Sequence, residues 1–173
     1  MKTLILSSFD GTAPQLIADS AVSTDSMPLF VPEGTWAGEV RAAVRIDRLG
    51  KSIKERFAER YYGAFTLVHC LQPQQSEVAL GALDQSVIHG RWLPLPEGAA
   101  EVTIAVGNEV RRAAVDIPRE ELHRFISRFS QLATFKTGDI IIFPTPLLRF
   151  TLAAPSALRV EVDGSNVLNF RIL

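Results

Sequence analysis

The sequence contains a single cysteine, no excess of either charge and no long hydrophobic run. Cys70 has no intramolecular disulfide partner, so we expect a reducing compartment. The 18 Lys and Arg residues balance 19 Asp and Glu residues without a basic cluster, which argues against nucleic acid or an anionic membrane as a partner. The apolar run before Phe9 is about five residues long, whereas a signal peptide needs roughly seven to fifteen and a membrane helix roughly twenty. We therefore expect a cytoplasmic protein.

Common catalytic and metal-binding motifs are also missing. The sequence has no glycine-rich phosphate loop, no paired cysteines, no histidine pair at helical metal-ligand spacing and no Gly-x-Ser-x-Gly element. His69 and Cys70 are adjacent, but successive side chains of a strand point to opposite faces, so we do not expect them to form a catalytic pair. Motifs therefore leave the catalytic residues unknown and assign no metal ligand.

The chain has 173 residues, 47% of them hydrophobic, which predicts one domain over residues 1–173. Residues 1–30 are interpreted as an irregular lead-in with one short buried strand at residues 4–6. Residues 39–46 alternate, so that Val40 and Val44 share an apolar face while Glu39 and Arg41 share a polar one. Further strands are predicted at residues 65–71, 101–106, 110–115, 139–143, 158–162 and 167–172, separated by turns and prolines.

Two segments show helical spacing. Residues 51–62 place apolar side chains at steps of four and stop at Gly63. In residues 116–132, Asp116 and Pro118 mark the start and an apolar stripe extends to Leu132, so we expect this helix to pack on a sheet. Many short strands with only two helices predict an α+β fold that is mostly β.

Residues 136–139 form a turn that enters a buried strand. Gly138 suits a positive backbone dihedral, and Asp139 suits a hydrogen bond within the turn. This structural interpretation needs no catalytic role for either residue.

Several short segments occur in an informative order from about Met27 to the C-terminus. Together they resemble the fumarylacetoacetate hydrolase family, whose members cleave or isomerise β-diketo and related oxo acids with a bound divalent cation. The resemblance implies a mixed β-sheet roll with two main helices and a homodimer. It rests on Glu39-Val40-Arg41, Gly50-Lys51, residues 65–70, residues 81–84, Gly138 to Ile141, Phe143 to Pro146 and residues 158–162.

The resemblance also exposes departures at the metal site. In the family, two glutamates of a Glu-x-Glu strand and a later aspartate hold the cation. Here Glu39 keeps its type, while Arg41 replaces the second glutamate and Cys70 replaces the aspartate. A guanidinium repels a divalent cation, so we expect Arg41 to donate to Glu39 or Asp84 and to fill the metal position with its own charge.

Other family residues are missing as well. By spacing from Asp84, the active-site lysine of the family corresponds to Gly81, and its Thr-Gly-Thr-Pro turn corresponds to Phe143 to Pro146, which keeps Thr145. The His–Glu pair of the family lid has no counterpart, because residues 9–24 contain neither type. We therefore expect a ligand-binding cleft lined by Glu39, Arg41, Cys70, Asp84 and Thr145, with no metal or other cofactor.

Three functional interpretations remain open at this point. The first is a degenerate family member, or pseudoenzyme, that binds a small carboxylate through Arg41 or binds a protein partner. The second is a divergent hydrolase or isomerase of a β-diketo or oxo acid, with Mg²⁺ or Mn²⁺ and with Glu39, Asp84 or His69 in new roles. The third is an unrelated, mostly β domain with a chance likeness. Under the first two, apolar residues around Phe143, Leu147, Leu148 and Phe150 either form a homodimer interface or close the core.

Overall fold

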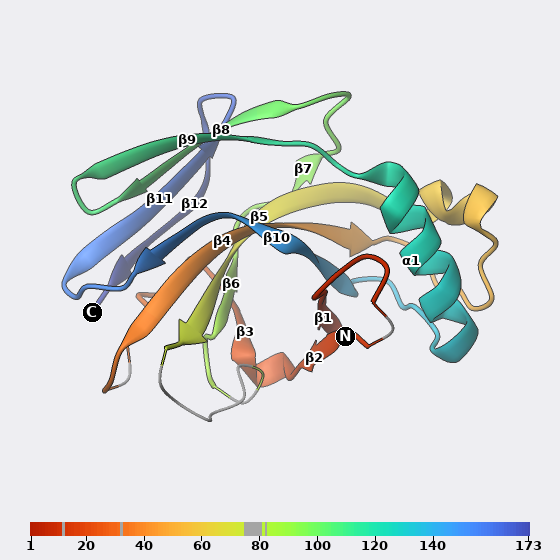
Figure 1. Cartoon of the computed structure of the whole chain (residues 1–173), viewed down its shortest axis with the longest axis horizontal. Helices are drawn as coiled ribbons and strands as arrows, with labels where there is room; N and C mark the ends of the chain where they lie inside the picture. The colour runs from red at the N-terminus through yellow and green to blue at the C-terminus, as the bar shows by residue number, and fades with distance from the viewer. Residues whose placement is uncertain (12, 32, 75–80, 82) are drawn as a thin grey trace.

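The fold was analysed in a computed structural model that describes residues 1–11, 13–31, 33–74, 81 and 83–173. Strands dominate it, with one α-helix and two short 3₁₀-helices among these residues (Figure 1). The elements are β1 (Thr3–Ile5), β2 (Gln15–Ile17), η1 (Asp19–Ala21), β3 (Val22–Thr24), β4 (Trp36–Ile46), η2 (Glu55–Tyr61), β5 (Tyr62–Pro73), β6 (Val87–His89), β7 (Leu93–Pro94), β8 (Ala100–Val106), β9 (Glu109–Val115), α1 (Arg119–Leu132), β10 (Ile140–Thr151), β11 (Ser156–Val162) and β12 (Ser165–Ile172).

A curled, mixed sheet organises the molecule. Its strand order is β2-β1-β10-β4-β5-β6-β3, and β7 also pairs with β5. The long strands β10, β4 and β5 are antiparallel neighbours at its centre, whereas β1 joins β10 and β3 joins β6 in parallel. The α+β, mostly β prediction is therefore confirmed.

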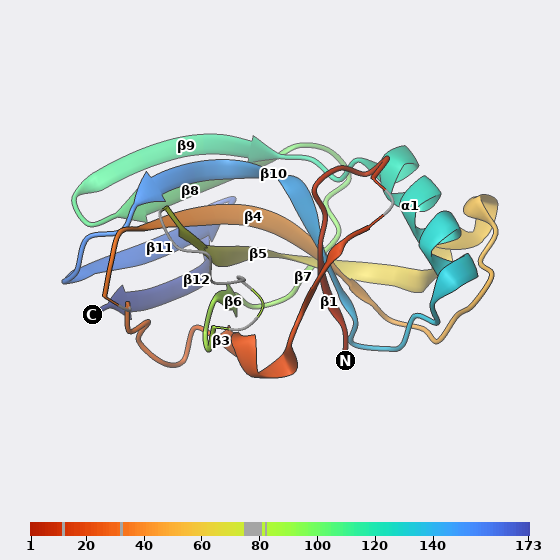
Figure 2. The ribbon, with the colours of Figure 1, turned by 60° about the horizontal axis from the view of Figure 1, so that its bottom comes forward.

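A second sheet, of order β12-β11-β8-β9, covers one face of the large sheet (Figures 1 and 2). The predicted hairpin of β8 and β9 forms, and Gly107 supplies the positive φ of 56° in its turn. The main core lies between the sheets and continues to α1, because alternate residues of β4 and β8 face it. Its members include Val40, Val44, Val102, Ile104, Leu122 and Phe125.

The opposite, concave face of the large sheet holds a smaller core. Edge elements supply part of it, since Ile5, Ile17 and Ala21 meet the central strands there. Apolar and polar side chains alternate between the two faces of residues 39–46 as expected. The face that carries Glu39 is also largely buried, because the curl of the sheet covers it. The polar face of the strand is therefore an interior face and not a solvent-facing one.

The N-terminal lead-in is more ordered than the sequence predicted. The first strand is confirmed and buried, but the rest of the segment over residues 1–30, for which we predict irregular structure, contains β2, η1 and β3. Each of these elements has only three residues, too few for an alternation to be recognised in the sequence.

The two helix predictions had different outcomes. The helix predicted at residues 51–62 is present in shorter form, as the 3₁₀-helix η2, and Gly63 lies inside β5 instead of ending the helix. The helix at residues 116–132 is confirmed as α1, except that Leu132 is exposed and not part of the buried stripe. It packs chiefly against η2 at the end of the large sheet, where Tyr62 Oη lies 2.8 Å from His123 Nε2. No helix of the described residues is both long and apolar enough to cross a membrane.

β10 continues through two prolines that were expected to end it. Its register against β4 shifts between Ile142 and Pro146 and again between Pro146 and Leu148. Proline has no N–H for the ladder, so the strand bulges here instead of stopping. Leu147, Leu148 and Phe150 consequently remain on the strand, partly buried against the main core.

The turn before β10 has the predicted structural role. Gly138 adopts a φ of 91°, and Asp139 Oδ2 accepts the Lys136 N–H at 2.8 Å. Asp139 is fully buried, and it also accepts the Lys2 N–H at 2.7 Å and pairs with Lys2 Nζ at 2.6 Å. This carboxylate therefore attaches the N-terminal strand to the start of β10.

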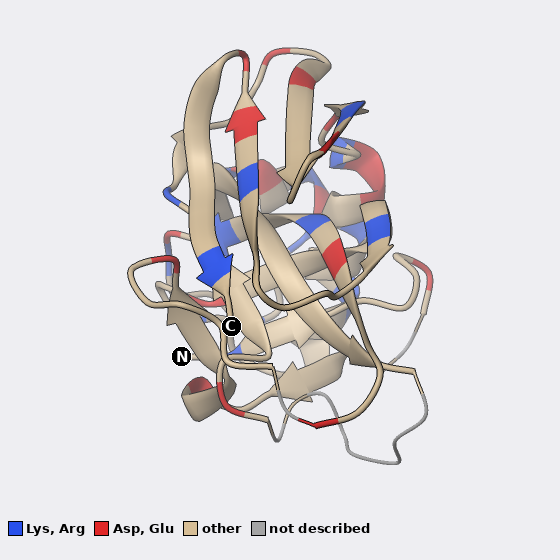
Figure 3. Cartoon of the chain, turned by 90° about the vertical axis from the view of Figure 1, so that its left-hand side faces the viewer, with Lys and Arg blue, Asp and Glu red and all other residues tan. Residues whose placement is uncertain are grey.

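Acidic and basic residues are interspersed on the side of the molecule that carries the β8–β9 turn (Figure 3). Both signs occur on neighbouring ribbons there, and Arg111 pairs with Glu109 at 3.0 Å. This side of the molecule therefore does not present a field of one sign.

Gly90 marks a close approach between the two sheets and provides a stability test. A Cβ at this position would overlap the backbone carbonyl of Val167, which cannot move without breaking the packing of β12. Gly90→Ala is therefore expected to lower the free energy of unfolding by about 2–3 kcal/mol in urea denaturation. Gly98→Ala is the matched control, because a Cβ there meets nothing within 4 Å, and it should change stability little. Equal stabilities of the two variants would contradict this packing.

Candidate functional site

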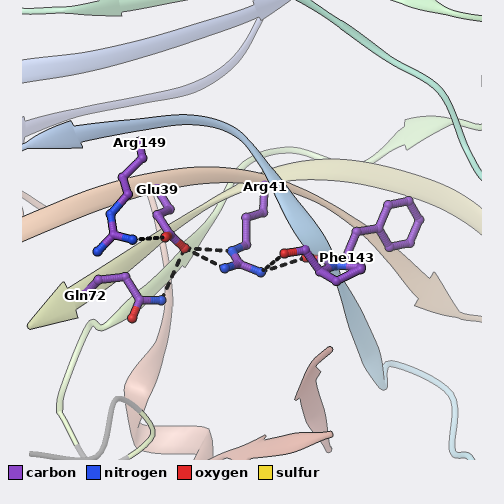
Figure 4. A network of polar contacts seen from close by, with 6 residues as sticks. Glu39, Arg41, Gln72, Phe143 and Arg149 are labelled. Carbon is purple, nitrogen blue, oxygen red and sulfur yellow. Dashed lines mark hydrogen bonds and ion pairs between the residues drawn. The ribbon is translucent and has the colours of Figure 1, made fainter. Parts of the chain in front are cut away.

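Glu39 and Arg41 form a buried ion pair on the concave face of the large sheet. Both lie on β4 two residues apart, so their side chains share a face. Arg41 Nε and Nη2 lie 2.8 and 2.7 Å from Glu39 Oε2 (Figure 4). The side chain of Arg41 is only 12% exposed and that of Glu39 only 5%, so little solvent screens the pair. The predicted donation from Arg41 to Glu39 is what the structure contains.

β10 holds the other end of the guanidinium. Arg41 Nη1 donates to the carbonyl oxygens of Phe143 and Pro144 at 3.0 and 2.6 Å (Figure 4). These carbonyls lie in the segment where the register of β10 against β4 is interrupted, which frees them from the ladder. Arg41 is thus fixed in position by a carboxylate on one side and two carbonyls on the other.

Two further residues on the same face complete the group that we call the Glu39 cluster: Glu39, Arg41, Gln72 and Arg149. Gln72 Nε2 donates to Glu39 Oε2 at 3.3 Å, and Arg149 Nη1 lies 3.7 Å from Glu39 Oε1 (Figure 4). Sequence reasoning missed both. Gln72 could have been found, because it follows Cys70 by two positions on one strand, but Arg149 required the register of β10 beyond its prolines.

Cys70 is directly opposite Glu39 in the pairing of β4 with β5 and belongs to the concave core. It is completely buried, and this burial raises the pKa of its thiol to about 12. The thiol is therefore protonated at neutral pH, a form that is a poor nucleophile and a poor metal ligand. Cys70 lies beside the cluster as a small apolar residue.

Two of the five predicted cleft residues lie elsewhere. Asp84 is exposed in a turn before β6, and no interaction joins it to the described residues of the cluster. Thr145 is exposed on the opposite side of β10, in a hollow of about 350 Å³ with Phe9 and Leu147. The structure therefore brings Glu39, Arg41 and Cys70 together and places Asp84 and Thr145 apart from them.

Gly81 and His69 also have defined positions. A Cβ on Gly81 would meet the Leu16 carbonyl at 2.9 Å, so this position has no room for a lysine; its neighbour Ala82 lies outside the described residues. His69 faces the main core, away from Cys70, as strand geometry predicted. It is completely buried, and burial lowers its pKa to about 3. The alternative metal set of His69, Glu39 and Asp84 is contradicted, since His69 and Glu39 lie on opposite faces.

No protein-family model and no curated protein matches the sequence. Solved structures do match. A protein from Yersinia pestis CO92, described as of the fumarylacetoacetate hydrolase family, is 19% identical with a TM-score of 0.76, over 99% of this chain and 92% of that one. This chain has the fumarylacetoacetate hydrolase fold.

Two enzymes with this hydrolase fold extend the comparison. The 2-hydroxyhepta-2,4-diene-1,7-dioate isomerase from Mycobacterium marinum is 16% identical with a TM-score of 0.79, over 99% of this chain and 74% of that one. Fumarylpyruvate hydrolase from Pseudomonas aeruginosa was solved in complex with Mn²⁺ and pyruvate. It is 18% identical with a TM-score of 0.76, over 93% of this chain and 78% of that one. The predicted curled mixed sheet is thereby confirmed.

The hydrolase fold implies a divalent cation, but the Glu39 cluster does not suit one. A hard cation requires several carboxylate, carbonyl or water oxygens, whereas Glu39 Oε2 already accepts from Arg41 and Gln72. At about 4 Å, a guanidinium and one unit of positive charge repel by about 4 kcal/mol at an intermediate dielectric. Among the residues that the structure describes, no three His, Cys, Asp or Glu side chains are grouped to hold a metal. The chain's own guanidinium provides the positive charge beside Glu39.

Proposed function

We propose that this protein is a degenerate, hydrolase-like binding protein that takes a small carboxylate, such as an oxo acid, at the Glu39 cluster without a divalent cation. The observation that carries the proposal is the buried Glu39–Arg41 ion pair, which sets a fixed guanidinium beside the one retained family glutamate. Metal-dependent cleavage or isomerisation of oxo acids is accordingly lost.

The charges of the cluster support an anionic ligand. Glu39 contributes one negative charge, and Arg41 and Arg149 contribute two positive ones, so one positive charge is left over. Arg41 is already bonded to Glu39 and to β10, whereas Arg149 is 59% exposed and approaches Glu39 only at 3.7 Å. Arginine binds carboxylates in a bidentate geometry. Arg149 is therefore the primary ligand-binding group, and Arg41 orients the cluster.

The ligand class also agrees with the structural neighbours. The P. aeruginosa hydrolase and a maleylpyruvate hydrolase from Sphingobium sp. SYK-6 were both solved with Mn²⁺ and pyruvate, a small oxo acid. In this chain, the excess positive charge of the Glu39 cluster would take the place of the cation in attracting such a carboxylate.

The test is ligand-dependent thermal unfolding of the chelator-treated protein, with pyruvate as the probe. A ligand that binds only the native state stabilises it by about 2.7 kcal/mol at 100 times its Kd. We expect pyruvate to raise the Tm, uncharged acetone to have no effect, and Mn²⁺ to add nothing.

A matched pair of variants localises the effect. Arg149→Met should weaken pyruvate binding by about tenfold, the loss of one charge-assisted contact. Arg124→Met, on α1, should leave it unchanged, because that exposed arginine pairs only with Glu121 at 3.9 Å. Stoichiometric Mn²⁺ binding with a raised Tm, or turnover of a β-diketo acid in Mn²⁺, would overturn the proposal in favour of a divergent metal-dependent hydrolase or isomerase.

The proposal includes a cytoplasmic location and a homodimer. The free thiol of Cys70 supports a reducing compartment, and the partly buried Leu147, which lies beside Phe143 in the hollow of about 350 Å³, supplies apolar surface for a second copy. Sedimentation of the purified chain tests the dimer, and a monomer at micromolar concentration would exclude it.

A further inference from the structure

A hollow of about 590 Å³ lies between the two sheets, on the face of β10 opposite the Glu39 cluster. The turn of the β8–β9 hairpin and the end of β10 enclose it, and its apolar wall consists of Ile104, Val106, Leu148 and Phe150. Asn108, Thr151 and Ser156 also line it. This volume falls in the range of small-molecule sites, which combine apolar walls with a few polar groups.

The charged residues of the hollow lie at its exposed rim. Glu109 and Arg111 line it but pair with each other at 3.0 Å. Arg149 also borders it, although its guanidinium is directed to Glu39 on the other face (Figure 4). The apolar wall behind this rim therefore favours an uncharged ligand, because Ile104, Leu148 and Phe150 offer no charge to an ion placed against them.

His69 contacts the Phe150 ring that lines this hollow, and it has no hydrogen-bond partner among the described residues. Its side chain is completely buried, and neither ring nitrogen has a partner among the described residues. The ring instead contacts Phe150 and Phe170, with centroids at 6.1 and 5.4 Å. A buried polar group left unpaired is unfavourable, so the imidazole is poised to accept or donate a hydrogen bond.

Gly38 shows where the free nitrogen points. A Cβ built on Gly38 would lie 2.8 Å from His69 Nε2 and would overlap the edge of the Phe150 ring. Nε2 and the Phe150 ring therefore meet above the same glycine. Because Phe150 is half-buried and lines the hollow, its ring is the partition between the hollow and the imidazole.

We propose that the hollow binds an uncharged, hydroxyl-bearing molecule with an apolar body, such as a phenol, whose hydroxyl reaches His69 Nε2 when the Phe150 ring swings aside. A neutral imidazole pairs well with a hydroxyl, since each group has a donor and an acceptor. The apolar body packs against Ile104 and Leu148 in the space that the displaced Phe150 ring leaves.

This inference does not depend on the proposed function. Arg149 and Phe150 are consecutive on β10 and serve opposite faces, so a ligand in the hollow and a carboxylate at the Glu39 cluster occupy separate sites. Pyruvate binding and phenol binding can therefore succeed or fail separately.

The experiment is a titration of the ¹⁵N-labelled full chain with phenol, toluene and benzoate, followed through the imidazole nitrogens by NMR. We expect phenol to shift a His69 nitrogen while His89 and His123 stay unchanged. Toluene, which lacks the hydroxyl, should bind at least fivefold more weakly, and benzoate should not compete with phenol. Equal affinities for phenol and toluene, or an unmoved His69 nitrogen, would overturn the proposal.

Variants separate a binding site from a merely structural histidine. Phe150→Ala removes the partition and should raise phenol affinity at least fivefold, whereas Phe30→Ala, at an exposed phenylalanine, should not. His69→Phe keeps a ring in the core and should abolish the preference for phenol over toluene. Thermal unfolding by circular dichroism verifies that each variant is folded. If a variant does not fold, the titration of the wild-type chain with phenol and toluene still tests the site. Unchanged phenol affinity in folded Phe150→Ala would contradict the role of the Phe150 ring as the partition between the hollow and His69.

Discussion

Arg41→Met is expected to lower the free energy of unfolding by about 3–5 kcal/mol, the cost of leaving a buried charge without its partner. Glu39 would keep a negative charge on a side chain that is only 5% exposed, and the carbonyls of Phe143 and Pro144 would lose their donor. Arg149 remains 3.7 Å from Glu39, which favours the lower end of the range. Urea denaturation monitored by circular dichroism measures the change.

The double variant Glu39→Gln/Arg41→Met distinguishes a lost charge pair from lost packing. It should recover at least about 2 kcal/mol relative to Arg41→Met, because no charge is then left buried. Arg45→Met is the matched control on the same strand face, since Arg45 is 39% exposed and meets Asp47 only at 3.4 Å; we expect a loss of less than about 1 kcal/mol. If Arg41→Met costs no more than this control, the ion pair does not hold β4 to β10.

Asp139→Ala should destabilise the chain by a similar amount, about 3–5 kcal/mol. The substitution removes the acceptor of the Lys2 and Lys136 N–H groups and the partner of Lys2 Nζ, in a position with no exposure. Hydrogen bonds to a charged group contribute about 1.5–3 kcal/mol each, and they are only partly additive. The measurement is again the free energy of unfolding in urea.

Two further variants calibrate the loss at Asp139. Asp139→Asn keeps the shape and one acceptor oxygen, so about half of the loss is expected. Asp19→Ala removes an exposed carboxylate that lies 3.7 Å from the N-terminal amine and should cost less than about 1 kcal/mol. A loss of similar size in Asp19→Ala would mean that burial of Asp139 adds nothing.

The regular part of the fold could be predicted because its signals are local. Alternation in residues 39–46, the turn residues between β8 and β9, and the apolar stripe before Leu132 each need only a short window of sequence. At residues 51–62 the apolar steps of four located a helix but not its type or length, since the segment forms the 3₁₀-helix η2 and β5 begins at Tyr62. Three-residue strands in the lead-in gave no pattern at all.

In the candidate site, too, the residues placed by local strand geometry were predicted, and those placed by long-range register were not. Glu39 and Arg41 were placed together because two positions on one strand necessarily share a face. Arg149 and Thr145 could not be placed, because the irregular register of β10 decides which of them faces Glu39, and prolines hide that register in the sequence. Asp84 was grouped with the cluster through the family resemblance alone, and it lies exposed in a separate turn.

The position of β10 between β1 and β4 has a consequence for synthesis of the chain on the ribosome. Thr3 pairs with Ile140, and Leu29 bridges to Ile172, so each of these early segments gains one of its neighbours only after the segment from residue 140 to residue 172 has been made. Until then β1 and β4 present open backbone edges, which are prone to non-native pairing with other nascent strands. We therefore expect folding to be slow for a domain of this size, with the open edges as natural targets for chaperones.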